Sequence, residues 1–217
     1  MASARTYGDQ CGVARALDVV GERWALLVVR ELLLGPKRFT DLRTGMPHAS
    51  ANVLAQRLRE LEEAGIVRRR RLGPPASSRV YELTDRGRDL EPVVIELGRW
   101  GSGAPFPPGD AKLGADSFVL ALKTLFDPSA AQDLSANYEL RFGDHRFRVE
   151  VADGELELAR GSATRPDATI ESDPDTLSAV LWQDRPLEKA LRSGDVKIEG
   201  SKSAVTRFIG LFSLPEG

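Results

Sequence analysis

A run of helix-breaking residues near the middle of the chain constrains the fold most. The segment Gly101–Gly109 contains four glycine or serine residues and three prolines within nine positions. It continues neither a helix nor a strand, because glycine is conformationally free and proline has no backbone N–H to donate. We interpret it as a linker, which predicts two domains, residues 1–103 and residues 111–217.

Length and composition allow a packed core in each half. The chain has 217 residues, of which 41% are hydrophobic and 29% charged, as in ordinary globular proteins. Its first ten residues lack the apolar stretch of a secretory signal, and its most apolar run, Trp24–Leu34, is too short to span a bilayer. With a single cysteine it forms no intramolecular disulfide. We therefore expect a cytoplasmic protein that does not associate with membranes.

The two halves differ in charge. Residues 1–103 carry 17 Lys and Arg against 13 Asp and Glu, a net charge of +4, whereas residues 104–217 carry 13 against 19, a net charge of −6. This asymmetry suggests two modules with different partners.

The first half has the element order of a winged helix-turn-helix. Apolar spacing and end signals predict helices over 13–19, 22–34, 39–43 and 50–64, strands over 66–72 and 79–83, and a last helix over 85–100. In this fold a recognition helix enters the DNA major groove and a hairpin, the wing, contacts the backbone.

The helix that begins at Ser50 is the candidate recognition helix. Leu54, Leu58 and Leu61 form its apolar stripe, and Asn52, Gln56, Arg59 and Glu63 lie opposite. Asn and Gln can pair bidentately with adenine and Arg with guanine, so this face is chemically suited to reading bases. Because Glu63 would repel phosphates, we expect the contacts to concentrate near the N-terminal end. The alternative is that any amphipathic surface helix has such a polar face.

The hairpin favours DNA binding further. Arg68–Arg71 lead into a Gly/Pro/Ser tip, and Arg79 follows. We see no stability reason for a strand pair to hold so many like charges, whereas phosphates would compensate them. A solvated charge run is the alternative. The candidate DNA contacts are Ser50, Asn52, Gln56, Arg57, Arg59, Arg70, Arg71, Ser77, Ser78 and Arg79.

Four motifs over about residues 11–100 resemble one family. They are Cys11–Trp24, Arg38–Leu42, Leu54–Val67 and Tyr81–Gly87, and they resemble the HxlR-type winged-helix transcriptional regulators. The resemblance implies a homodimer with the first and last helices of the domain at the interface. It also implies a palindromic operator with half-sites roughly one helical turn apart.

The chain departs from the family pattern at the start of the recognition helix. Such regulators usually read Gly-Ile-Ser with a following lysine or arginine there, whereas this chain has His48-Ala-Ser50 and Asn52. The operator sequence therefore cannot be carried over. His48 either contacts a phosphate or makes its hydrogen bonds within the turn.

Cys11 lies where some members of this family carry a redox-sensing thiol. Near a helix N-terminus its pKa can be depressed, which would make it reactive. The alternative, which we favour, is a partly buried structural cysteine.

The second half is predicted to be α+β, an antiparallel sheet covered by helices on one side. We expect helices over 116–126, 174–182 and 203–212, and strands over 138–142, 147–151, 156–158, 168–171 and 196–199. Gly143-Asp144 and Asp153-Gly154 are hairpin turn signals. The two histidines, His48 and His145, fall in different modules, and no catalytic or metal-spaced cluster is visible. We expect no enzyme activity, no metal and no cofactor.

The segments Asp167–Ser178, Pro186–Gly200 and Phe208–Phe212 resemble the sterol-carrier-protein type-2-like domains. This likeness spans about residues 112–214 and implies an apolar tunnel for a hydrophobic molecule. The candidate lining residues are Phe118, Leu122, Leu181, Trp182, Phe208, Leu211 and Phe212. The alternative is that they form only the core of a small domain.

Joined together, the halves suggest a repressor that responds to a hydrophobic small molecule. Such a ligand would shift the two recognition helices relative to each other, with a coupling of about 1–3 kcal/mol. Two alternatives remain: a lipid carrier whose first half only dimerises, and a redox regulator that acts through Cys11.

Overall fold

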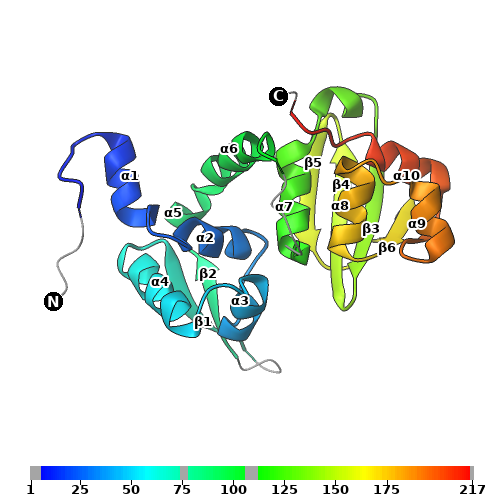
Figure 1. Cartoon of the computed structure of the whole chain (residues 1–217). Helices are drawn as coiled ribbons and strands as arrows, with labels where there is room; N and C mark the ends of the chain where they lie inside the picture. The colour runs from blue at the N-terminus through cyan, green and yellow to red at the C-terminus, as the bar shows by residue number, and fades with distance from the viewer. Residues whose placement is uncertain (1–5, 74–77, 106–111, 216–217) are drawn as a thin grey trace. The chain divides into compact units, whose positions relative to one another are not determined.

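The computed structural model describes residues 6–73, 78–105 and 112–215 (Figure 1). The chain forms two compact units, which divide between Val94 and Ile95. None of the helices in the described ranges has the length and apolar character needed to cross a membrane.

In the described residues, the first unit has four helices before a hairpin, as expected from the sequence, and two helices after it. Its elements are α1 (Gly12–Val20), α2 (Ala25–Leu33), α3 (Phe39–Gly45), α4 (Ala51–Glu63), β1 (Val67–Arg71), β2 (Arg79–Leu83), α5 (Asp85–Arg88) and the start of α6 (Glu91–Ser102). The helix predicted over 85–100 is therefore two helices, because the chain turns at 89–90.

The core of this unit forms where α2 and α4 meet the base of the hairpin. Val28, Val29 and Leu32 of α2 and the leucine stripe of α4 are buried together. Burying a residue of this type contributes roughly 1.5–3 kcal/mol. The apolar positions recur every three or four residues, so each helix buries one face and leaves the other for solvent or a ligand.

Gly87 lets α5 pack against the base of the hairpin. A Cβ atom at this position would lie 2.2 Å from the backbone oxygen of Ile66. Thr84 caps α5 with its side chain, which accepts a hydrogen bond from Gly87 N and donates to Gly65 O. The hairpin, α4 and α5 are thus tied together at one point.

The predicted boundary at 103 and the division found in the structure differ. The C-terminal part of α6 belongs to the second unit because it packs on α7 (Ala115–Leu125). A Cβ added at Gly98 would lie 3.2 Å from Thr124 Oγ1, and Arg99 Nε donates to Thr124 O at 3.3 Å. The last part of the predicted linker, from residue 106 on, lies outside the residues that the structure describes.

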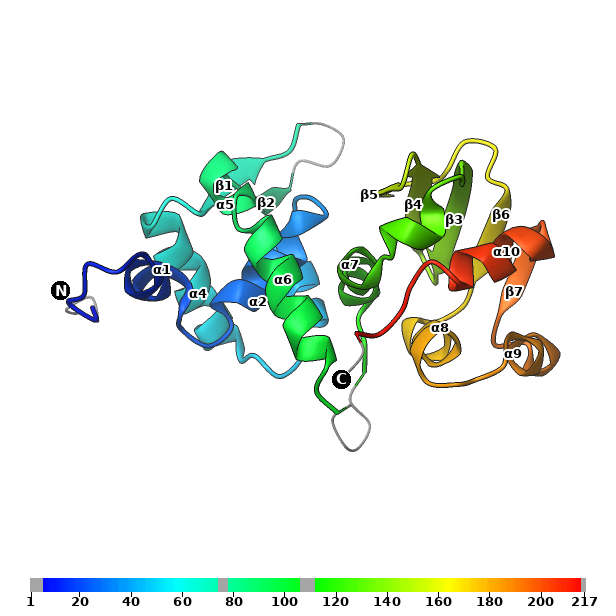
Figure 2. The same ribbon diagram turned by 90° about the horizontal axis from the view of Figure 1, so that it is seen from above.

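The second unit is a five-stranded sheet with helices on one face (Figure 2). The strand order is β5-β4-β3-β6-β7. The elements after α7 are a 3₁₀ turn (Pro128–Ala131), β3 (Ala136–Phe142), β4 (His145–Ala152), β5 (Glu155–Arg160), β6 (Ala168–Glu171), α8 (Pro174–Trp182), α9 (Leu187–Ser193), β7 (Lys197–Gly200) and α10 (Lys202–Ile209).

The sheet is mixed rather than antiparallel, which corrects the prediction. The β3–β4 and β4–β5 pairs are antiparallel hairpins, and Asp153 and Gly154 both have positive φ at the second turn. β6, however, pairs with β3 in parallel, because the chain crosses from the β5 edge to the far side of β3. Local turn signals do not encode such a crossover. The short helix α9 was also not predicted.

Candidate nucleic-acid interface

Helix α4 presents the polar face that the sequence predicts. Ser50 is its N-cap, and its hydroxyl accepts a hydrogen bond from Val53 N at 3.3 Å. The stripe Leu54, Leu58 and Leu61 is buried. Asn52, Gln56, Arg59 and Glu63 are exposed. The side chains chosen for base reading are therefore accessible from solvent, while Ser50 begins the helix.

Arg57 is not part of this exposed face. Its side chain is only 12% exposed and pairs with Glu22 at 3.7 Å and with Glu60. It ties α4 to the segment that precedes α2, and we withdraw it as a DNA contact. Gln56 Nε2 donates to Glu60 Oε1 at 3.0 Å, so pairing with a base edge would require its amide to break that bond.

The arginines of β1 have partners inside the protein, contrary to the expectation that nothing stabilises them there. Arg68 Nε lies 2.7 Å and Arg70 Nε 3.1 Å from the carboxylate of Glu82, whose side chain is 6% exposed. Arg69 pairs with Glu62 at 2.8 Å and lies over the Tyr81 ring. The hairpin register, which pairs Arg68 with Glu82, places these charges together. Three of the four arginines of the run thus have carboxylate partners.

The last arginine of the run is different. Arg71 is directly opposite Arg79 in the antiparallel register, and both are exposed. In the described part of the chain neither has a carboxylate partner. Like charges directly opposite each other destabilise a strand pair, so this position favours an external anion. Of the two tip serines, Ser78 has a buried Oγ without a hydrogen-bond partner in the described ranges, and Ser77 lies outside those residues.

The two histidines lie in different units. His48 is exposed in the turn before α4, and His145 is exposed at the start of β4 in the other unit. The described residues contain no group of three or more side chains that could hold a metal ion.

Cys11 is exposed, so the expectation of a partly buried cysteine is wrong. It is the N-cap of α1, and the backbone N–H groups of Val13 and Ala14 lower the pKa of its thiol. The helix N-terminus therefore stabilises the thiolate.

The candidate tunnel residues of the second unit pack together as its core. Phe118 stacks near Phe142 and Trp182, with ring centroids 5.2 and 5.5 Å apart, and Phe208 lies 5.0 Å from both Tyr138 and Phe212. Phe118, Leu122, Phe208, Leu211 and Phe212 are buried, whereas Leu181 and Trp182 are half-buried. This arrangement fits the alternative of a filled core, and the tunnel stays a prediction.

Sequence reasoning missed the carboxylates that hold the wing. Glu82 follows Arg68 by 14 positions, and only the hairpin register brings the two opposite each other. Glu62, the partner of Arg69, comes from the end of α4. The alternation of strand residues, applied to both strands of the hairpin, was the signal that could have identified Glu82.

Comparison with known proteins bears on the first unit most strongly. Residues 19–105 match the HxlR-like helix-turn-helix family. The HTH-type transcriptional regulator YvaP of Bacillus subtilis is 38% identical over 89 residues, which cover 41% of this chain and 82% of that protein. The chain belongs to the HxlR-like helix-turn-helix family. A second HTH-type transcriptional regulator of the same organism, YybR, is 37% identical over 93 residues, 43% of this chain and 74% of YybR.

Among solved structures, the redox regulator HypR in its oxidized form is 35% identical. The match covers 45% of this chain and 100% of HypR, with a TM-score of 0.42.

The second unit resembles a different family from the one expected. Residues 112–217 match the alkyl sulfatase C-terminal family. The sterol-carrier-like assignment of this unit is not what the comparison found, and it stays a prediction.

Proposed function

We propose that this HxlR-like protein is a sequence-specific DNA-binding transcriptional regulator that acts as a homodimer and represses its target. The observation that carries the proposal is the facing pair Arg71 and Arg79 in a winged helix-turn-helix unit. Phosphates relieve the repulsion between these two guanidinium groups, whereas within the described chain no carboxylate does.

The proposed contacts divide into base reading and backbone binding. Asn52, Gln56 and Arg59 on the exposed face of α4 read base edges in the major groove. Arg71 and Arg79 bind phosphates from the wing. The remaining candidates, Ser50, Arg70, Ser77 and Ser78, are secondary contacts, since Ser50 caps α4 and Arg70 is shared with Glu82.

Exposed apolar side chains favour dimerisation. Val13 and Leu17, one turn apart on α1, are 67% and 41% exposed. On α6, Val93, Leu97 and Trp100 are 51%, 48% and 82% exposed at helical spacing. Such stripes are typical of helices that pack against another chain. A dimer would present two recognition helices to a palindromic operator.

For the second unit we propose a sterol-carrier-like role in which a hydrophobic small molecule adjusts DNA affinity. Its support is the apolar sheet face under α7, α8 and α10. Titration of the protein–DNA complex with medium-chain fatty acids tests this role, and unchanged DNA affinity at saturating fatty acid would contradict it. The proposal assigns the chain no catalytic activity, metal or cofactor, and places it in the cytoplasm.

The main test separates base reading from phosphate binding. Wild-type protein, Asn52→Ala and Arg71→Gln are used to select binding sites from randomised duplex DNA, with Gln132→Ala in the second unit as the control. We expect Asn52→Ala to change the preferred bases, Arg71→Gln to weaken all sites alike, and the control to match wild type. DNA affinity that is micromolar or weaker and indifferent to these changes would instead indicate a lipid carrier whose first unit only dimerises.

A second candidate function is redox control through Cys11. The thiol is exposed and its pKa is lowered at the N-terminus of α1, which makes it a better nucleophile near neutral pH. DNA binding is measured before and after treatment with diamide for wild type and Cys11→Ser. If the oxidant affects both proteins equally, Cys11 is not the sensor.

A further inference from the structure

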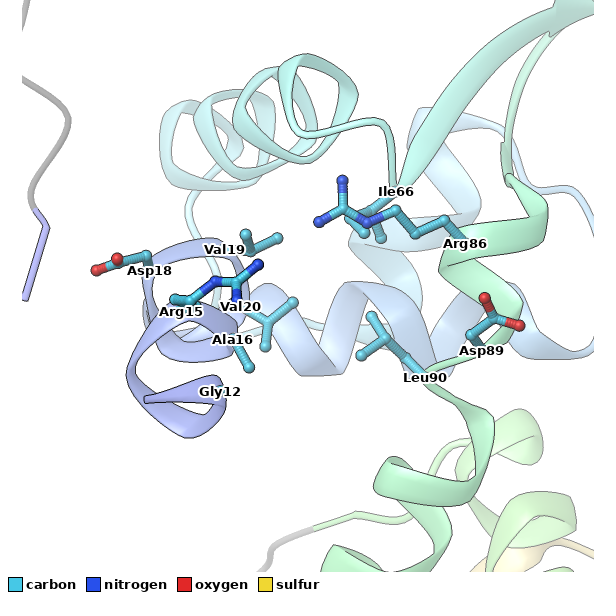
Figure 3. A pocket seen from close by; sticks show the side chains of 10 residues that line it. All are labelled: Gly12, Arg15, Ala16, Asp18, Val19, Val20, Ile66, Arg86, Asp89 and Leu90. Carbon is cyan, nitrogen blue, oxygen red and sulfur yellow. The ribbon is translucent and has the colours of Figure 1, made fainter. Parts of the chain in front are cut away.

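A groove in the first unit, away from the recognition helix face, has the composition of a ligand site. It has a volume of about 660 Å³ and lies between α1 and the residues on both sides of the wing, Ile66 before it and Arg86, Asp89 and Leu90 after it. Figure 3 shows its lining: α1 contributes one wall, and Ile66, Arg86 and Leu90 contribute the floor and the other wall. Pockets for small ligands commonly have volumes of about 300–1,000 Å³.

The floor is apolar and the rim is cationic. Val20 and Ile66 are 6% and 2% exposed and form part of the floor. Arg15 and Arg86 extend from opposite walls toward each other (Figure 3). Arg86 Nη1 donates to Ala64 O at 2.9 Å, which holds the side chain over the groove and leaves its other N–H groups for a ligand. The backbone N–H of Arg15 donates to Cys11 O, whereas its guanidinium has no hydrogen bond or ion pair with any residue in the described ranges.

The acidic residues that line the groove do not cancel this charge. The Asp18 carboxylate points away from the groove and accepts hydrogen bonds from Tyr7 N at 2.8 Å and Thr6 Oγ1 at 3.0 Å. Asp89 lies at the far edge from Arg15 (Figure 3). The groups that converge on the centre of the groove are therefore guanidinium groups.

We propose that this groove binds a small apolar organic acid, with its carboxylate or sulfonate between Arg15 and Arg86 and its hydrocarbon part on Val20, Ile66 and Leu90. Arginine pairs with such anions through parallel hydrogen bonds. On α1, Gly12, Arg15, Ala16 and Val19 line the groove from one face at helical spacing, whereas Val20 lies one turn after Leu17, at the edge of the apolar stripe. The site thus borders the apolar stripe of α1, but the two exposed residues assigned above to dimerisation, Val13 and Leu17, do not line it.

Binding is measured on the full chain without DNA, so its failure is distinct from failure of the proposed function. The probes are 2-naphthoate and its neutral counterpart 2-naphthamide, titrated by calorimetry. We expect naphthoate to bind about tenfold or more tightly than naphthamide, since charged hydrogen bonds exceed neutral ones in strength. Equal affinity for the two probes, or no binding of either, overturns the proposal.

Two variants locate the site and a third controls for charge. Arg15→Gln removes one guanidinium from an exposed position, and Ala16→Trp, also at an exposed position, fills the groove from α1 without replacing a core residue. We expect each to weaken naphthoate binding about tenfold or more, while Arg192→Gln, an exposed arginine of the second unit, leaves it unchanged. The proposal is overturned if Arg15→Gln binds like wild type. It is also overturned if Ala16→Trp alters the sedimentation coefficient of the ligand-free protein, since a second copy would then occupy the groove.

Discussion

Removal of the two facing wing arginines gives the sharpest quantitative test of DNA binding. Five arginines on the hairpin, Arg68–Arg71 and Arg79, are opposed by the two carboxylates Glu62 and Glu82, which leaves a net charge of +3. The pair without carboxylate partners in the described chain, Arg71 and Arg79, accounts for two of these three charges. We therefore expect the double variant Arg71→Gln/Arg79→Gln to lose most of the wing's phosphate binding.

The magnitude follows from counterion release. Each neutralised phosphate contributes a slope of about −0.9 to the plot of log affinity against log salt concentration. The double variant should reduce the magnitude of this slope by about 1.8 for each protomer. Fluorescence anisotropy of labelled DNA from the gene's own upstream region, measured across a salt series, gives both slopes.

Matched variants control for the loss of charge itself. Lys189→Gln/Arg192→Gln removes two exposed positive charges from α9 in the second unit and should leave the slope unchanged. Arg68→Gln should change the slope by less than 0.9, because Glu82 already offsets part of that charge. A double wing variant whose slope equals that of wild type would refute the reasoning.

Three further predictions concern the wing, the packing and the thiol. Glu82→Gln should make the salt slope steeper by up to about 0.9 in the same anisotropy assay, because it removes the one negative charge that Arg68 and Arg70 share. An unchanged slope would show that those two arginines do not bind phosphate. Gly87→Ala should lower the free energy of unfolding by roughly 2–4 kcal/mol in urea denaturation, because the added Cβ would collide with Ile66 O. Gly12→Ala is the control and should be nearly neutral, because a Cβ there meets open space. Similar stabilities for the two variants would contradict the packing around Gly87. Alkylation of Cys11 by iodoacetamide should persist to lower pH than that of free cysteine, since its lowered pKa keeps the thiolate present there; a profile that coincides with free cysteine would disprove the effect of the helix N-terminus.

Much of the fold was predictable because its signals are local. The leucine stripe of α4, the N-cap Ser50 and the turns at Gly143-Asp144 and Asp153-Gly154 each act within a few residues, and the structure contains them where the sequence places them. The break between α5 and α6 and the parallel pairing of β6 with β3 were not predicted. The apolar helical pattern continues across the break between α5 and α6, so periodicity does not reveal it. The pairing of β6 with β3 joins segments that are distant along the chain, and no turn motif specifies such a pairing.

The candidate site likewise has features that the sequence determines and features that only the tertiary structure decides. The sequence alone determined which side chains of α4 face outward, because helical periodicity and the buried leucines leave no other choice. Only the tertiary structure decided which arginines have carboxylate partners within the protein, since Arg57 and most of the wing run meet carboxylates from other elements. Charge partners depend on distance in space rather than in sequence, and Coulomb attraction falls with that distance. The arginine run by itself therefore predicted a binding surface, and the hairpin register shows that its last member, Arg71, faces Arg79.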